Sequence, residues 1–203
     1  MKRALMLTAA VAAAISLAAC SKRADETVAD TSAAADQSVG ATQDAIGAAV
    51  GQTSAATLGS YDTGAFVSNT SQSDMYEVRA AQIAETRSKS ADVKAFAKMM
   101  ATAHTAMMNE MKPLVMAANE KPADKLDERR QGFIDNLTGA TDANFDKTYI
   151  DQQVAAHGEA LTLMQGYADA AGGDAGLKAG AAKATPKVQI HLDKAKAIQT
   201  SMK

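Results

Sequence analysis

The chain has 203 residues, a formal net charge of −2 and one cysteine, which excludes a disulfide framework and a four-cysteine zinc module. A nearly neutral chain without runs of Lys and Arg lacks the clustered positive charge that binds phosphates, so no nucleic-acid partner is expected. Alanine supplies 47 residues, whereas β-branched and aromatic residues are too sparse for a sheet core. The composition therefore predicts an all-α fold.

Residues 1–19 have the form of a lipoprotein signal peptide. Lys2 and Arg3 precede an uncharged stretch from residue 4 to residue 19 that ends in small residues. This stretch is shorter than the roughly 20 residues that a membrane-spanning helix needs. We therefore expect an export signal that is removed from the mature protein.

The only cysteine stands directly after this stretch. Leu17-Ala18-Ala19-Cys20 resembles the lipobox of bacterial lipoproteins, which implies that Cys20 is lipidated and becomes the first mature residue. An ordinary signal peptide followed by an incidental cysteine is the alternative. Ser21, by resemblance to the enterobacterial sorting rule, indicates the outer membrane. The expected location is the cell envelope, as an outer-membrane lipoprotein that faces the periplasm and contacts the membrane through its anchor.

Residues 20–62 are expected to be the lipidated cysteine followed by a flexible tether. After Cys20 the segment consists mainly of Ala, Ser, Thr, Gly, Asp and Gln, with only five larger aliphatic residues. Such a composition buries too little apolar surface to offset the entropy of ordering. About 40 flexible residues would carry a domain several nanometres from the membrane.

Residues 63–203 are expected to form the folded domain. Apolar residues recur there in alternating steps of three and four, which is the pattern of helices packed in a bundle. Four such stripes run over residues 66–84, 93–114, 150–168 and 177–198.

Turn residues divide the stripes into two pairs. Ser88 to Ala91 forms a short break, with Ser90 as the N-cap of the next helix, and Gly172-Gly173-Asp174 forms another, with Asp174 as the cap. The intervening connection, from about residue 120 to 142, contains its own short amphipathic helix through residues 126–137. Loops that are short, long and short predict an antiparallel four-helix bundle with one long crossover.

The three histidines of the chain fall on three different stripes. His104 lies on the second, His157 on the third and His191 on the fourth, while Glu77 lies on the first. At about 1.5 Å per residue, the two members of each helix pair lie level to within about one helical turn. The sequence therefore predicts that Glu77, His104, His157 and His191 converge at mid-bundle, where they could hold one divalent metal ion such as Zn, Fe, Mn or Cu.

A metal-free cluster is the alternative. Buried polar groups need partners whether or not a metal is present, so Glu77 could accept hydrogen bonds from one or two of the imidazoles. In that case the carboxylate charge should favour at least one protonated histidine. The protein would then be a structural or stress-related envelope protein with an unknown protein partner.

A di-iron oxidase centre is not expected. Such centres place a Glu three residues before a His on two helices, whereas Ala101 precedes His104 and Val188 precedes His191 at that spacing. No nucleophile constellation or phosphate-binding loop appears either. We therefore expect a non-catalytic protein and keep a metal-dependent oxidoreductase as a weaker alternative.

Methionine offers a separate interpretation. Six of the eleven methionines lie between residues 99 and 116, and Met100, Met107 and Met108 lie within about one turn of His104. Thioethers combined with imidazole suit Cu(I), so these residues are candidate soft-metal contacts in a copper-handling protein. The simpler interpretation is that methionine fills gaps in an alanine-rich core.

The segment that leads into the third stripe carries Asp146 and Tyr149. Asp146 precedes His157 by eleven residues, about 16 Å along a helix, so the two cannot share a metal. We expect Asp146 in the first turn, near the positive end of the helix dipole, with Asp142 as the N-cap. Tyr149 should bury its ring and form a hydrogen bond at the end of the bundle.

These residues together resemble a known family, the bacterial domain-of-unknown-function family 4142. The resemblance rests on Phe66-Val67 before Glu77, on residues 93–100 before His104-Thr105, on Phe145-Asp146-x-x-Tyr149 before residues 154–157, and on Pro186-x-x-x-x-His191. The chain departs from the family pattern at Ala103, where an Asp commonly precedes the histidine, and at Thr185, where a Leu commonly precedes the proline. The resemblance implies an exported, ferritin-like four-helix bundle with no known activity. The sequence leaves the oligomeric state open.

Overall fold

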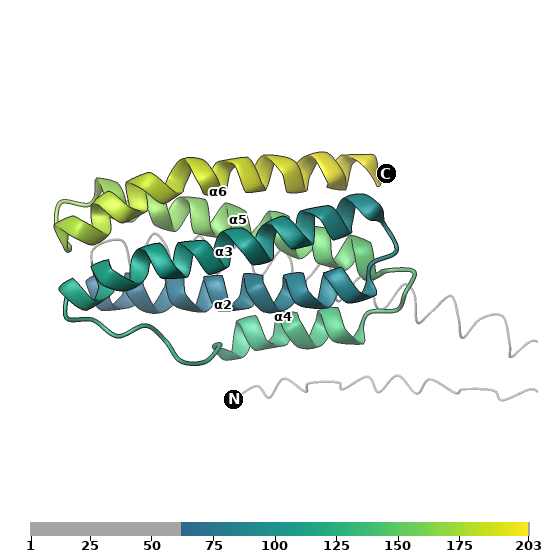
Figure 1. Ribbon diagram of the computed structural model, residues 1–203, viewed down its shortest axis with the longest axis horizontal. Coiled ribbons are helices and arrows are strands. Elements are labelled where there is room, and N and C mark those ends of the chain that lie inside the picture. The colour runs from purple at the N-terminus through teal and green to yellow at the C-terminus, as the bar shows by residue number, and fades with distance from the viewer. Residues whose placement is uncertain (1–61, 203) are drawn as a thin grey trace, which may run out of the picture. The chain divides into compact units, whose positions relative to one another are not determined.

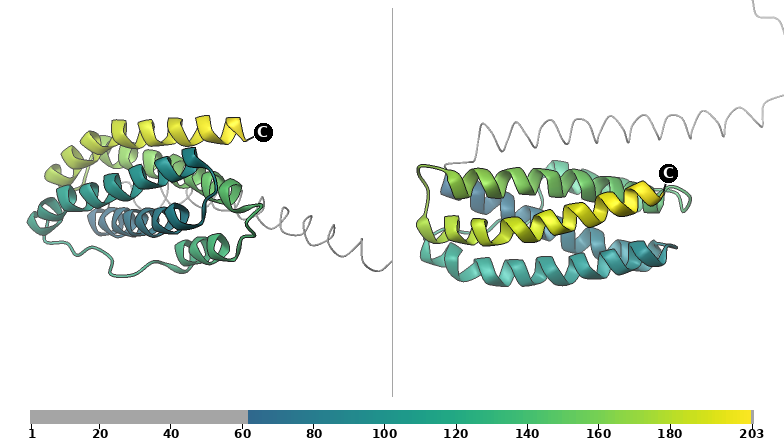
Figure 2. Two further views of the ribbon diagram at one scale, coloured as in Figure 1. Left: turned by 45° about the vertical axis from the view of Figure 1, so that its right-hand side comes forward. Right: turned by 90° about the horizontal axis from the view of Figure 1, so that it is seen from above.

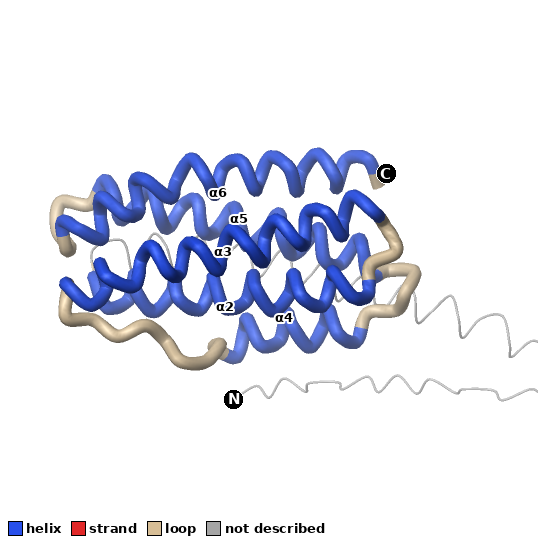
Figure 3. The backbone as a smooth tube through the Cα atoms, in the orientation of Figure 1, coloured by secondary structure: helices blue, strands red, loops and turns tan. Residues whose placement is uncertain are grey.

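The computed structural model describes residues 62–202, which fold into five α-helices (Figures 1 and 3). The signal peptide, Cys20 and the tether before residue 62 lie outside the described residues. The five helices are α2 (Thr63–Arg87), α3 (Ala91–Ala117), α4 (Glu128–Gly139), α5 (Phe145–Asp169) and α6 (Ala175–Ser201). The all-α prediction, the four long helices and the short helix in the crossover are confirmed.

Side chains cap most of these helices at their N-termini. The Oγ of Ser90 accepts a hydrogen bond from the Val93 amide, and the Oδ1 of Asp174 accepts one from the Leu177 amide, as the sequence predicts. The predicted cap of α5 is wrong: Asn144 is its N-cap residue and forms no side-chain cap bond. Asp142 instead lies two residues further out and pairs with Arg87 at 3.5 Å, because the crossover approaches the end of α2 there.

The four long helices form a ring in which each neighbour runs antiparallel to the next. α2 packs against α3 and α5 against α6, while contacts of α3 with α6 and of α2 with α5 close the bundle. Figures 1 and 2 show that the crossover returns along the bundle, so that α5 starts at the end where α2 finishes. Among residues 62–202, no helix is long and apolar enough to cross a membrane.

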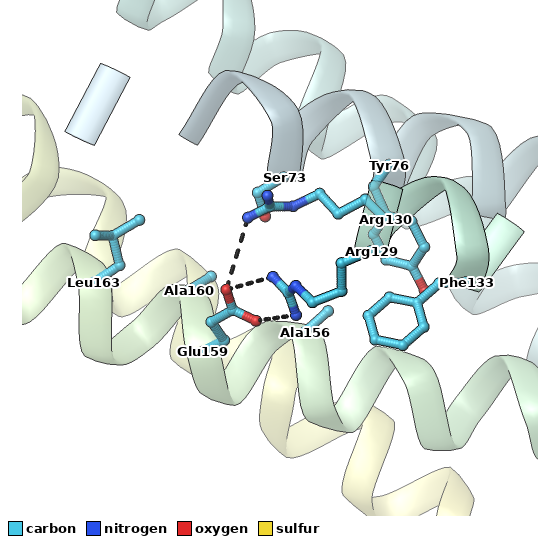
Figure 4. A pocket seen from close by; sticks show the side chains of 9 residues that line it. All are labelled: Ser73, Tyr76, Arg129, Arg130, Phe133, Ala156, Glu159, Ala160 and Leu163. Atoms are coloured by element: carbon cyan, nitrogen blue, oxygen red, sulfur yellow. Dashed lines mark hydrogen bonds and ion pairs between the residues drawn. The ribbon is translucent and has the colours of Figure 1, made fainter. Parts of the chain in front are cut away.

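Arginine side chains hold α4 against the bundle. The guanidinium of Arg87 donates hydrogen bonds to the carbonyls of Leu137, Thr138 and Ala140, which satisfies the end of α4. At the other end, Arg129 donates two hydrogen bonds to the Glu159 carboxylate, at 2.7 and 2.8 Å (Figure 4). The long crossover is therefore a packed layer of the domain, fixed at both ends of its helix.

The core consists of two apolar clusters. One contains Phe96, Met100 and Ile150, and the other contains Met107, Leu163 and Leu177. His104 lies in the chain between Met100 and Met107, and the other two histidines lie at equivalent positions on α5 and α6. A polar layer at mid-height therefore divides the core of the bundle.

Candidate metal centre

Three imidazoles from three helices form a triangle in this polar layer. The ring centroids of His104, His157 and His191 lie 5.4, 5.5 and 5.6 Å apart. One nitrogen from each ring can be chosen so that all three lie within 4.8 Å of one another. Their exposed fractions are 3%, 1% and 7%, so the triangle is enclosed by protein. These three residues could hold a metal ion.

Hydrogen bonds at the outer ring nitrogens orient two of the rings. Nδ1 of His157 donates to the Gln153 carbonyl at 2.9 Å, and Nδ1 of His104 donates to Oδ1 of Asp74 at 2.8 Å. Each Nδ1 therefore carries a proton, which in a neutral ring leaves a lone pair on Nε2. The two Nε2 atoms face each other at 3.4 Å. Two lone pairs at that distance repel, so the arrangement favours a cation or a proton between them.

The spacing of one pair of imidazole nitrogens agrees with tetrahedral coordination. Zinc binds histidine nitrogen at about 2.0–2.1 Å, so two such ligands at a tetrahedral angle lie about 3.3–3.4 Å apart. The observed separation between Nε2 of His104 and Nε2 of His157 is 3.4 Å. Three imidazole ligands would leave the fourth tetrahedral position open for water or another small ligand.

Glu77 lies beside this triangle and is not a member of it. Its Oε1 is 3.6 Å from Nδ1 of His157, the nitrogen that does not face His104. Its Oε2 is buried and has no hydrogen-bond partner among residues 62–202. Burial raises the pKa of Glu77 to about 7. The charge on His104 and the nearby Gln153 amide act in the opposite direction and lower this pKa. The Gln153 effect is one of proximity, because neither its Nε2 nor its Oε1 makes a well-formed hydrogen bond.

Asp74, and not Glu77, is the carboxylate that forms a hydrogen bond with an imidazole, that of His104. It lies one turn earlier on α2, is 5% exposed, and accepts the hydrogen bond from His104. Burial raises the pKa of Asp74, while the hydrogen bond and charge of His104 lower it. A carboxylate that holds the outer nitrogen of an imidazole is a common arrangement behind metal-binding histidines. Its spacing of three residues from Glu77 was the only sequence signal for this role.

The three histidines differ in their readiness to bind a metal. Burial lowers the pKa of His157 well below its usual value, and it lowers that of His191 to about 4, in both cases with help from the charge of His104. Burial also opposes the charged form of His104, but the hydrogen bond to Asp74 and the charge of Glu77 outweigh it, so its pKa is raised. Two rings are therefore neutral near pH 7, and the third would exchange its proton for a metal ion.

The candidate soft-metal residues are distributed over different parts of the bundle. Met100 belongs to one apolar cluster of the core and Met107 to the other. Met108 lines a separate cavity between α2 and α3. The structure therefore gives Met100 and Met107 packing roles on either side of the histidine layer.

Asp146 and Tyr149 lie at the start of α5, away from the histidines in sequence and height. Asp146 occupies the first turn, as predicted, and its Oδ2 accepts a hydrogen bond from the Ser90 amide at 3.2 Å. Tyr149 is fully buried, but the expected hydrogen bond is absent: its hydroxyl has no partner among the described residues. Apolar neighbours such as Phe96 surround the ring and leave the hydroxyl enclosed. Asp146 thus ties α5 to the turn between α2 and α3.

Comparison with known proteins supplies a family and no relative. No curated protein and no solved structure matches the chain. One family model covers residues 48–198, so the match begins before α2 and ends within α6. The family is the domain of unknown function DUF4142, and the chain belongs to it.

Proposed function

We propose that this chain is a lipid-anchored protein of the cell envelope whose helical domain holds one divalent metal ion through His104, His157 and His191. The observation that carries the metal assignment is the enclosed triangle of imidazoles. In it, the Nε2 atoms of His104 and His157 lie 3.4 Å apart, and the Nδ1 atom of each of these two rings already forms a hydrogen bond. The role is non-catalytic: the ion would join α3, α5 and α6 at mid-height and stabilise the bundle.

The charges of the site suit a divalent ion. Asp74 and Glu77 are both buried beside the triangle and together provide up to two negative charges. Three neutral imidazoles with a doubly charged cation would be balanced by these two carboxylates, whereas an unbalanced buried charge is costly. A ligand set of imidazoles alone favours Zn or Cu(II) over Mn, which prefers oxygen ligands.

The competing function is a metal-free structural cluster. The raised pKa of His104 favours this alternative, because a protonated His104 could donate from its Nε2 to Nε2 of His157. In that case the two carboxylates would serve a single imidazolium, and the protein would act through an unidentified partner in the envelope. Both functions use the same geometry and differ only in what lies between the rings.

Metal analysis of the protein separates the two. Protein purified without chelators and then dialysed should carry close to one metal ion per chain, and His157→Ala should reduce this to background. His191→Gln, at the most exposed of the three rings, provides a second variant that is more tolerant of substitution. Gln165→Ala, at an exposed position on α5, is the control.

Thermal stability gives an independent measurement. Added Zn or Cu(II) should raise the melting temperature of the stripped protein, and neither histidine variant should respond. A stripped protein that binds neither ion and shows no change in melting temperature would overturn the metal assignment. Destabilised variants with unchanged metal response would instead support the structural cluster.

The anchor is tested separately at Cys20, which lies outside the described residues. Support for lipidation comes from the position of the only cysteine at the end of the signal-like stretch. Cys20→Ala should release the protein from membranes, whereas Ser21→Ala should leave it bound. If the Cys20→Ala protein still fractionates with membranes, the lipid anchor is wrong.

A further inference from the structure

A cavity of about 380 Å³ lies between α2, α3 and the start of the crossover, outside the histidine triangle. This volume falls within the range of about 300–1000 Å³ that is typical of small-molecule sites. Its lining includes four methionines, Met75, Met108, Met111 and Met116, together with valine, alanine and proline side chains. Methionine side chains are flexible and polarizable, so such walls adapt to apolar ligands of varied shape.

The crossover forms one wall of the cavity and is held in place by hydrogen bonds. The Ser71 hydroxyl accepts a hydrogen bond from the Ala123 backbone amide at 2.9 Å, and the side-chain Oε1 of Gln72 accepts one from the Asp127 backbone amide at 2.7 Å. The cavity is thus a feature of the packed domain. Pro122 and Ala123 of the crossover supply the wall opposite α2 and α3.

Most polar side chains in the cavity lining already form hydrogen bonds within the protein. Thr70 and Thr105 donate to carbonyls of their own helices, at 2.9 and 2.7 Å, and Asp74 accepts the hydrogen bond from His104. Two residues of α3, Asn109 and Lys112, have side chains that form no hydrogen bond or ion pair with residues 62–202. Both are exposed and lie three residues apart, on one face of the helix.

We propose that this cavity binds a single-chain amphiphile with an anionic head group. The apolar tail would lie among the four methionines, and the head group would pair with the Lys112 ammonium and accept a hydrogen bond from the Asn109 amide. Lys112 carries the only charge of the lining that has no partner among the described residues, so it sets the sign of the head group. Free fatty acids and lysophospholipids with a net negative head group share this chemistry.

The site is independent of the proposed metal, although Asp74 forms part of the wall of one and supports a histidine of the other. Binding can therefore be tested on metal-free protein in the presence of a chelator. Loss of the metal assignment would leave this proposal intact, and the reverse also holds.

The experiment uses the full chain labelled with ¹³C at its methionine methyl groups, titrated with dodecanoate. The signals of Met75, Met108, Met111 and Met116 should shift and saturate at one ligand per chain, while that of Met100, in the core, stays unchanged. Dodecanol should bind more weakly than dodecanoate, and dodecyltrimethylammonium should bind least. Titration with lysophosphatidylglycerol, which carries a net negative charge, then distinguishes the two natural sources of this chemistry by affinity.

Two variants test the two halves of the site. Lys112→Gln should weaken dodecanoate binding about three- to tenfold and leave dodecanol unaffected, because it removes one exposed charge. Lys98→Gln, at another exposed position of α3, is the matched control. Ala123→Phe should fill the cavity from the crossover and abolish the binding of both ligands.

Several outcomes would overturn the proposal. These are the absence of saturable shifts, equal affinity for the anionic and cationic amphiphiles, or unchanged binding by Ala123→Phe. Contacts between the four methionine methyls and residues before Asp62, seen without added ligand, would assign the cavity to the chain's own preceding segment instead.

Discussion

Replacement of Asp74 by asparagine tests the proposed support of the metal site without removing a ligand. Asp74 is 5% exposed, and its Oδ1 lies 2.8 Å from Nδ1 of His104. Asparagine has nearly the same shape and keeps a carbonyl oxygen that can accept the same hydrogen bond. Asp74→Asn therefore removes the negative charge behind His104 while the geometry is preserved.

The expected loss of affinity follows from this contact. Substitution of a hydrogen-bonded partner behind a metal-binding histidine typically weakens metal binding about 10- to 100-fold. That range corresponds to about 1.4–2.7 kcal/mol at 25 °C. The loss should lie toward the upper end, because burial leaves little water to screen the interaction between the carboxylate and the bound cation.

Competition between the protein and a chromophoric chelator, at pH 7.5 with added zinc, measures this change. Asp135→Asn is the matched control, since Asp135 also accepts one hydrogen bond, from Gln131 at 2.8 Å, but lies on the exposed face of α4. Equal zinc affinity in Asp74→Asn and wild type would refute the support role. A complete loss of folding in Asp74→Asn would instead show that the pair is needed by the metal-free bundle.

Two further predictions concern stability. Gly173 has a φ of +90°, and a Cβ there would lie 2.9 Å from the Tyr167 hydroxyl oxygen, so Gly173→Ala should lower the free energy of unfolding by at least about 1–2 kcal/mol. Gly172→Ala, with open space around its Cβ, should stay within about 0.5 kcal/mol of wild type in the same urea titration, and equal effects at the two glycines would contradict the prediction. For metal-free protein, the pKa of Glu77 is raised from 4.5 to about 7, so its protonated form stabilises the fold below pH 4.5, and that contribution is lost as the pH rises through 7. The unfolding free energy of wild type minus that of Glu77→Gln should therefore fall by about 3 kcal/mol over this interval, and a difference that does not change with pH would contradict the assignment.

Hydrophobic periodicity and capping residues were sufficient to predict the helices of the fold. The caps at Ser90 and Asp174 follow from side chains that accept hydrogen bonds from amides three residues later, an interaction within one turn. The cap predicted at Asp142 is wrong because α5 begins at Phe145, so Asp142 lies two residues before the N-cap position, where its exposed carboxylate pairs with Arg87. Local spacing was sufficient at Ser90 and Asp174, where the predicted cap residue stands directly before the first helical residue.

The sequence by itself determined that the domain is a four-helix bundle and that all three histidines lie on its buried faces, because helical periodicity assigns each residue to a face. Only the tertiary structure decided that Asp74 forms a hydrogen bond with a histidine, at 2.8 Å, whereas Glu77 lies 3.6 Å from its nearest imidazole nitrogen. The two carboxylates lie one turn apart on the same side of α2, so the choice depends on the rotation and axial position of α2 against α3. Those are set by packing throughout the core, such as the stacking of Phe66 on Tyr167 at 3.8 Å, which no single helix encodes.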